Sequence, residues 1–287
     1  MATKTKTGHF VLRTLILTVL ALTAFAANSV LCRLALGTGS IDAPGFTIVR
    51  LLSAAAVLWL ILKGVNRRTD PSSMGSWTAS SMLFVYAITF SLAYISLDTG
   101  TGALILFGSV QMTMIMSSLV TGSRLRLTEW LGVVLAFAGL VYLVLPGVSS
   151  PSLEGFILMT VAGLAWGIYT LKGRGSINPL ADTSYNFLRT IPFVMVLLIA
   201  TLDNMQFSFT GVVLAVLSGA IASGVGYTIW YMALAGLSTT VAAVVQLSVP
   251  AIAALGGVVF VGESITLRLT LSTLVILGGI LLVVARR

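Results

Sequence analysis

The sequence is short of charge. Only 8% of its 287 residues are Asp, Glu, Lys or Arg, whereas soluble domains carry about 25%. Hydrophobic residues make up 57% of the chain, and the mean hydropathy is +1.07. Because so few charges cannot cover the surface of a protein of this size, the composition excludes a water-soluble globular domain.

Cysteine and histidine are also scarce. The single cysteine, Cys32, excludes an internal disulfide and any cysteine metal cluster. The single histidine, His9, lies in the N-terminal tail, so no buried histidine can activate a serine nucleophile, and we expect no metal centre. The chain also lacks the Gly-x-x-x-x-Gly-Lys-Ser/Thr loop of ATP-driven motors. We therefore expect neither an enzyme nor a bound cofactor.

Long apolar runs dominate the chain. A membrane-spanning helix needs about 20 apolar residues, and runs of about this length lie near 14–36, 44–62, 76–97, 101–121, 127–145, 153–171, 183–202, 210–234, 239–261 and 266–285. Short connections between the runs predict one compact bundle. The first run contains Ala24-Phe25-Ala26 behind a basic tail, as a signal peptide would. Because the run continues past Ala26, we interpret it as the first span.

The net charge of +8 could suggest a nucleic-acid partner, but the cations are distributed as in a membrane protein. If the N-terminus is cytoplasmic, most of the 16 cations fall in cytoplasmic segments: Lys4, Lys6, Arg13, Lys63, Arg67, Arg68, Arg124, Arg126, Lys172, Arg174, Arg286 and Arg287. This asymmetry follows the positive-inside rule. We expect a multi-pass protein of a bacterial inner membrane, with both termini in the cytoplasm and lipid rather than nucleic acid around it.

The second half of the chain loosely repeats the first at a separation of 140 residues. The clearest stretch has Gly122, Leu127, Leu131, Gly139 and Val144 recurring as Gly262, Leu267, Leu271, Gly279 and Val284. Each half holds five apolar runs, and an odd number reverses the direction of insertion. The sequence thus predicts an all-α fold of ten transmembrane helices in an inverted 5+5 repeat around a central cavity, with the repeats at 1–147 and 148–287.

These motifs resemble the drug/metabolite transporter superfamily, of the type with two EamA-like repeats. The end of the second half is similar to that family's Pro, Gly-Glu-x-hydrophobic-Thr and Gly pattern, and each repeat has an aromatic-x-x-x-Arg element: Pro250, Gly262-Glu263-Ser264-Ile265-Thr266, Gly278-Gly279, Phe46 to Arg50, and Tyr185 to Arg189. The first half departs from the pattern, with Val110 in place of Pro and Ser123 in place of Glu. Within the superfamily the chain looks most similar to bacterial exporters of aromatic and other neutral amino acids, the YddG type.

Amides and aromatic rings deep in the predicted spans are the candidate substrate contacts. An amide facing lipid would lose hydrogen bonds, so these amides should face a wet cavity or bond other helices. Aromatic rings can line a cavity for a partly apolar solute or simply pack in the core. The predicted substrate-binding residues are Asn28, Tyr86, Tyr94, Gln111, Trp166, Tyr169, Tyr227, Trp230 and Gln246.

Three further residues within the spans are candidates for gating or structural roles. Arg50 and Arg189 occupy corresponding places in the two halves, where each could satisfy helix-end carbonyls, form a gate pair or meet a substrate carboxylate. Pro250 interrupts the hydrogen bonding of the ninth span and could bend it. All eight acids fall at or near span ends. The absence of a mid-depth carboxylate favours facilitated transport or exchange over proton coupling.

The sequence and the resemblance together predict a secondary transporter that exports amino acids, aromatic ones included, or related small metabolites by alternating access. Ten spans would hold a complete pathway, so we expect a functional monomer with a small-molecule substrate. A transporter of drugs, polyamines or nucleotide sugars is one alternative, although a cationic cargo would require buried acids, which the predicted spans lack. An intramembrane enzyme or a non-transporting scaffold is a second alternative. The enzyme would require ionisable residues at mid-depth, and the scaffold would carry large soluble loops.

Overall fold

The structure, a computed structural model, describes residues 2–65, 74–122, 126–145, 150–174, 176–234, 236–237 and 239–284. Side chains are not described for residues 2–10, 239, 240, 243 and 284. The predicted repeat boundary at 147/148 therefore lies outside the described residues. The same holds for the side chains of several of the predicted cytoplasmic cations, which are Lys4, Lys6, Arg67, Arg68, Arg124, Arg286 and Arg287.

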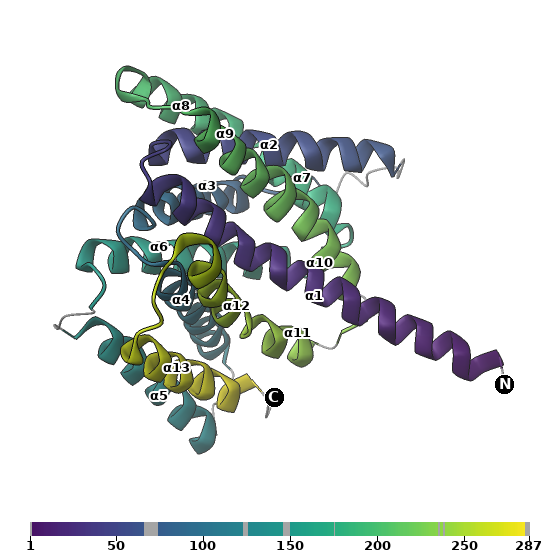
Figure 1. Cartoon of the computed structure of the whole chain (residues 1–287). Coiled ribbons are helices and arrows are strands. Elements are labelled where there is room, and N and C mark those ends of the chain that lie inside the picture. Colours follow the sequence, from purple (N-terminus) through teal and green to yellow (C-terminus); the bar gives the residue numbers. More distant parts are fainter. Residues whose placement is uncertain are drawn as a thin grey trace.

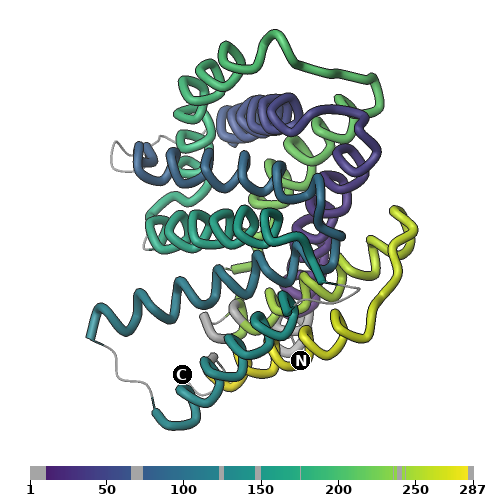
Figure 2. The backbone as a smooth tube through the Cα atoms, turned by 90° about the vertical axis from the view of Figure 1, so that its left-hand side faces the viewer, coloured from purple at the N-terminus to yellow at the C-terminus, as the bar shows by residue number. Residues whose placement is uncertain are grey.

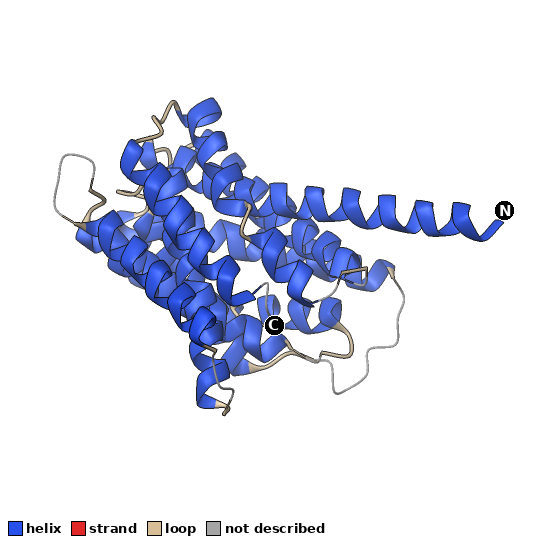
Figure 3. Cartoon of the chain, turned by 90° about the horizontal axis from the view of Figure 1, so that it is seen from below, coloured by secondary structure: helices blue, strands red, loops and turns tan. Residues whose placement is uncertain are grey.

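Five helices make up the first half: α1 (Ala2–Gly37), α2 (Ala43–Gly64), α3 (Trp77–Ala93), α4 (Thr99–Val120) and α5 (Leu127–Val144). Their boundaries agree with the apolar runs to within four residues, except that α1 begins at Ala2, well before the run. Asp42 and Ser76 cap α2 and α3 by accepting hydrogen bonds from backbone amides of the first turn. Figure 3 shows helices throughout the described chain, with no extended strand.

The second half is more broken. It contains α6 (Leu153–Gly173), α7 (Pro179–Leu188), α8 (Ile191–Thr201), the short η1 (Leu202–Asn204), α9 (Phe209–Val216), the π-helical η2 (Leu217–Val225), α10 (Gly226–Leu234), α11 (Thr239–Gln246), α12 (Val249–Gly256), the π-helical η3 (Gly257–Val261) and α13 (Leu267–Val284). Two of the breaks fall just before Pro192 and Pro250, each of which lies in the first turn of the following helix. Proline lacks the amide proton that would continue the preceding helix.

Eight helical segments of the described chain are long and apolar enough to cross a membrane, and α3 and α13 are shorter apolar helices. The segment Pro179–Asn204 joins α7, α8 and η1, and Phe209–Leu234 joins α9, η2 and α10. Large apolar side chains such as Leu60, Val196 and Phe209 lie exposed on the outside of the bundle. A surface of this kind is suited to lipid rather than water. The protein is therefore a polytopic, all-helical membrane protein.

Helices of the two halves pack against each other. α3 packs along α6, and α1 packs along α9, η2 and α10, while α5 and α13 form a pair at one edge of the bundle (Figure 1 and Figure 2). Glycine permits the close approach of the edge pair, because a Cβ atom on Gly132 would lie 2.4 Å from the carbonyl oxygen of Gly279. The interior between α1, α3, α4, α6 and α10 holds the cavity described next.

Candidate substrate-binding cavity

A cavity of about 410 Å³ lies between the helices of the two halves. Its lining residues come from α1, α3 and α4 of the first half and from α6, α7, η2, α10 and α11 of the second. This volume lies within the range of small-molecule sites. One end of the cavity reaches Gly173 and Arg174, which are exposed at the connection between α6 and α7. We call this the α6–α7 end of the bundle.

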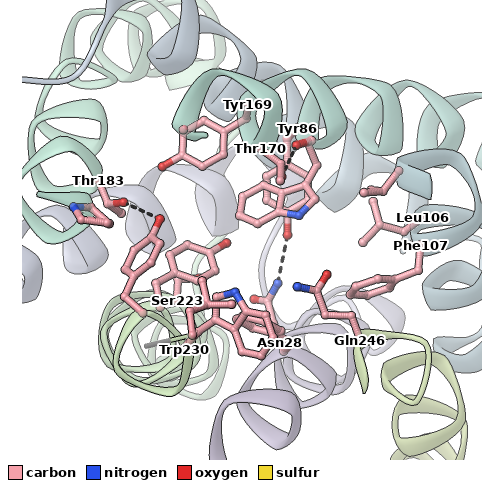
Figure 4. Close-up of a pocket in the computed structure, with 18 of the residues that line it drawn as sticks. Asn28, Tyr86, Leu106, Phe107, Tyr169, Thr170, Thr183, Ser223, Trp230 and Gln246 are labelled. Carbon is pink, nitrogen blue, oxygen red and sulfur yellow. Dashed lines mark hydrogen bonds between the residues drawn. The ribbon is translucent and has the colours of Figure 1, made fainter. Parts of the chain in front are cut away.

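Aromatic rings form one wall of the cavity. Trp166 of α6 stacks on Tyr169 at 5.1 Å between ring centroids and on Tyr227 of α10 at 5.3 Å, and it contacts Tyr86 of α3 at 4.8 Å. Trp230 lies one helical turn from Tyr227 and also lines the cavity. Figure 4 shows the Tyr169 and Trp230 rings on either side of the open space. The wall offers flat apolar faces with polar edges.

Polar groups face the rings. The Tyr86 hydroxyl accepts a hydrogen bond from Asn28 Nδ2 at 3.3 Å, and Asn28 Oδ1 accepts one from Ser218 at 2.5 Å. The amides of Asn28 and Gln246 turn toward the same space (Figure 4). Ser223 also lines the cavity, and its buried hydroxyl has no hydrogen-bond partner among the described residues. A solute between the rings and these amides would therefore meet uncharged donors and acceptors, while the charged lining residues Arg174 and Asp182 belong to the α6–α7 end.

The structure brings most of the predicted substrate-binding residues together. Those that line the cavity are Asn28, Tyr86, Gln111, Trp166, Tyr169, Tyr227, Trp230 and Gln246. Tyr94 does not line it. Its fully buried ring packs against Gly102, and its hydroxyl donates to the carbonyl of Thr99. Tyr94 follows Phe90 by one turn and its ring packs on that of Phe90 at 4.8 Å between centroids, so it lies behind the last lining residue of α3 rather than at the cavity.

The three predicted gating or structural residues all lie outside the cavity lining. Arg50 is buried in the middle of α2, with Nη2 donating to the Tyr86 hydroxyl at 2.9 Å. Arg189 is the C-cap residue of α7, at the break between α7 and α8 inside the segment Pro179–Asn204, and it donates to the carbonyl of Met74. Pro250 is buried in the first turn of α12, where the ninth predicted span is broken.

Several lining residues escaped the sequence analysis. Thr183 and Tyr231 are hydrogen-bonded to each other at 2.8 Å between hydroxyl oxygens, and Asp182 accepts from the backbone amide of Gly75 at 2.8 Å. Asp182 is one of the eight acids expected at or near span ends, and neither Thr183 nor Tyr231 was among the predicted contacts. The neighbouring hydroxyls and loops come from distant parts of the chain. No periodicity within one helix could have indicated these pairings.

A second polar cluster lies at the far end of α1, which we call the Arg33 cluster. Glu263 accepts hydrogen bonds from the backbone amide of Thr99 at 3.0 and 2.9 Å and from Arg33 Nε at 3.2 Å. Arg33 also donates to the carbonyls of Tyr94 and Ile95 and lies 3.6 Å from Asp98. The cluster ties α1, the start of α4 and the loop before α13 together, so this end of the bundle is held closed.

The described side chains offer no obvious metal site. Within the described ranges, His, Cys, Asp and Glu form no group of three or more that could hold a metal ion. The two carboxylates of the Arg33 cluster are engaged by Arg33 and by the backbone of α4.

Comparisons with known proteins agree with a transporter fold. Residues 153–285 match the EamA-like transporter family. An uncharacterized protein of Pseudomonas aeruginosa is 50% identical over 275 residues, which cover 96% of each chain. An uncharacterized transporter of Archaeoglobus fulgidus is 26% identical over 267 residues, covering 88% of this chain and 91% of its own. One crystal structure superposes with a TM-score of 0.67 at 17% identity, over 94% of this chain and 99% of that one, which shows the fold alone.

The helical membrane bundle, its internal cavity and the EamA-like match of its second half together indicate a multi-pass membrane transporter. The second half of the chain, residues 153–285, is an EamA-like transporter domain, and the Pseudomonas aeruginosa relative aligns with both halves. This family lies in the superfamily that the sequence motifs resemble.

Proposed function

We propose that this protein is a secondary transporter of the bacterial inner membrane that exports neutral amino acids, aromatic ones included, by alternating access. The observation that carries the proposal is the cavity between the two halves, with stacked rings on one side and amides on the other. An aromatic amino acid presents a flat apolar ring and a compact polar end. The aromatic rings of the cavity would pack against the ring of the amino acid, and the amides would hydrogen-bond its polar end.

Alternating access requires one end of the cavity to be closed while the other is open. The cavity reaches exposed residues at the α6–α7 end, and the Arg33 cluster closes the opposite end. Lys63, Lys172 and Arg174 lie at the α6–α7 end. By the positive-inside rule we assign this end of the bundle to the cytoplasm. On this assignment both termini are cytoplasmic, and the conformation of the transporter is inward-open.

We further propose that all ten helical segments span the bilayer as an inverted 5+5 repeat. Two reciprocal contacts support this arrangement. Asp42 of the first half accepts from the backbone amide of Gln206 at 2.5 Å, and Asp182, at the corresponding position of the second half, accepts from the amide of Gly75. The repeat-related Gly122 and Gly262 both have positive φ angles, 91° and 77°. Such reciprocity is expected when two similar units pack about an approximate two-fold axis.

Counterflow in proteoliposomes tests the proposal. Vesicles loaded with unlabelled phenylalanine should accumulate labelled phenylalanine transiently, and Trp166→Ala should reduce this uptake. A control variant, Trp130→Ala, removes an exposed ring outside the cavity and should leave the uptake unchanged. Saturable flux is expected for aromatic and other neutral amino acids. Failure to detect any saturable flux across a broad amino-acid panel, with protein that is folded and correctly reconstituted, would reject the proposed cargo.

A further inference from the structure

Arg50 carries a buried positive charge that no described carboxylate neutralises. Its side chain is 2% exposed, and it forms no salt bridge with the described residues. Its guanidinium carbon lies 5.1 Å from the ring centroid of Tyr86 and 4.9 Å from that of Phe90. Nη1 is buried without a hydrogen-bond partner among the described residues. Arginine remains charged in proteins, and a buried charge without a counter-ion is costly.

The charge of Arg50 reaches the cavity through Tyr86. Tyr86 and Phe90 both line the cavity, and Arg50 lies directly behind them. The Tyr86 oxygen accepts hydrogen bonds from both Arg50 Nη2 and Asn28 Nδ2. Because its two acceptor positions are occupied, the hydroxyl proton is left to donate. Hydrogen bonding to a cation polarises the O–H group and strengthens it as a donor.

We call the part of the cavity beside Tyr86 and Phe90, away from the α6–α7 end, its inner end, and the other polar residues described at this end are uncharged amides and hydroxyls. The buried Ser223 hydroxyl lines the cavity without a partner, and the amides of Gln111 and Gln246 line it as well. Asp182 is the one carboxylate among the described lining residues. It lies in the first turn of α7, close to the exposed α6–α7 end, and accepts from Gly75 and Ser176. The inner end of the cavity thus has the buried positive charge of Arg50 behind it, and the one described lining carboxylate belongs to the other end.

We propose that this inner end binds a carboxylate group of the cargo, with the Tyr86 hydroxyl as the contact and Arg50 as a positioning residue that acts through it. The stacked rings of Trp166 and Tyr227 would take the apolar part of the same molecule. The inference rests on the proposed function, because it assumes that the cavity is the substrate site. It deepens that function by assigning the carboxylate of such a solute to Tyr86 and Arg50 and its apolar side chain to the stacked rings.

Binding of three matched probes to the purified full-length protein tests the inference. Phenylalanine, phenylalaninamide and phenethylamine share the ring and the amine and differ at the carboxylate. Titrations can be followed by intrinsic tryptophan fluorescence, since Trp166 and Trp230 both line the cavity. The wild-type protein should bind phenylalanine about tenfold more tightly than either analogue, because hydrogen bonds to a charged acceptor are stronger than neutral ones.

Variants separate this role from general stability. Arg50→Gln and Tyr86→Phe should each bring the affinity ratio close to one, and Arg50→Lys should keep most of the preference. The ratio is measured within a single variant, so a loss of folded protein does not change it. If Arg50→Gln does not fold, Tyr86→Phe alone decides. Arg268→Gln removes a charge outside the cavity and should leave the ratio unchanged.

Two outcomes would overturn the inference. If the wild-type protein binds the analogues as tightly as phenylalanine, or if Tyr86→Phe keeps the full preference, the carboxylate does not bind here, although the cavity remains the substrate site. If none of the three probes binds to folded protein, the aromatic amino-acid cargo itself is rejected, and the inference with it.

Discussion

The Arg33 cluster should control opening at its end of the bundle, and Glu263→Gln is the sharpest way to disturb it. Glu263 accepts from the first backbone amide of α4 through both carboxylate oxygens and from Arg33 of α1. Its side chain is 12% exposed, so solvent screens these bonds little. Glutamine has the same shape and retains one acceptor oxygen, but it lacks the charge. The substitution therefore weakens the links while leaving the packing nearly unchanged.

The size of the effect follows from the contacts. A hydrogen bond to a charged partner contributes about 1.5–3 kcal/mol and a neutral bond about 0.5–1.5 kcal/mol. Losing the charge should thus cost about 1 kcal/mol for each of two donors, the Thr99 amide and the Arg33 guanidinium. A loss of about 2 kcal/mol from the closed arrangement raises the population opened at this end about thirtyfold.

Cys32 reports this opening directly. It is the single cysteine of the chain, it is fully buried, and it precedes Arg33 on α1. A maleimide can reach it only when the surrounding helices separate, so its labelling rate follows the population of the open state. Glu263→Gln should label about thirty times faster than the wild-type protein. Cys32→Ser removes the labelled thiol and gives the background signal of the assay.

A matched control distinguishes opening from general loosening. Glu129 also accepts a hydrogen bond from a backbone amide at the start of a helix, that of Arg126 at 2.6 Å, but it lies at α5 and away from the Arg33 cluster. Glu129→Gln should leave the labelling of Cys32 near the wild-type rate. The reasoning is refuted if Glu263→Gln labels no faster than wild type, or if both variants accelerate labelling equally.

Three further predictions follow from particular contacts. Trp166→Ala should weaken phenylalanine binding about tenfold, because it removes the central stacked ring, and fluorescence of the remaining tryptophans or calorimetry measures this; Trp166→Phe should lose less. Tyr94→Phe should lower the free energy of unfolding by about 1 kcal/mol, because it loses the hydrogen bond to Thr99. Its affinity for phenylalanine should not change, and a large loss of affinity would show that Tyr94 contacts the substrate. Gly219→Ala should lower the melting temperature, because its Cβ would lie 2.1 Å from backbone and side-chain oxygens of α2, at a cost of about 1–3 kcal/mol. Gly278→Ala, with nothing within 4 Å, is the control and should melt as the wild-type protein does.

Helix positions and the candidate cavity residues were predictable because lipid imposes a simple rule on the sequence. Every spanning segment must be apolar, so Asn28, Gln111 and Gln246 are conspicuous within their runs. The structure places all three at one cavity. Tyr94 was among the predicted substrate contacts, and it lies eight residues after Tyr86, on the same face of the helix. The rings of Tyr86, Phe90 and Tyr94 do contact one another in sequence, but the cavity ends at Phe90, and the spacing along one helix does not show how far a cavity extends.

Contacts between distant segments could not be predicted in this way. Glu263 belongs to a recognisable Gly-Glu motif, but its partners Arg33 and Thr99 lie far away in the sequence. Arg50 could have faced helix-end carbonyls or a partner, and only its place behind Tyr86 shows that it has no described counter-ion.

The amino-acid sequence by itself determined that this chain is a helical membrane protein with two related halves and few ionisable groups at depth, because hydrophobic run length and charge placement are properties of single segments. Only the tertiary structure decided which polar groups meet, where the cavity reaches exposed residues and which end the Arg33 cluster closes. Those features depend on how helices pack across the bundle, and residues that touch there need have no regular spacing along the chain.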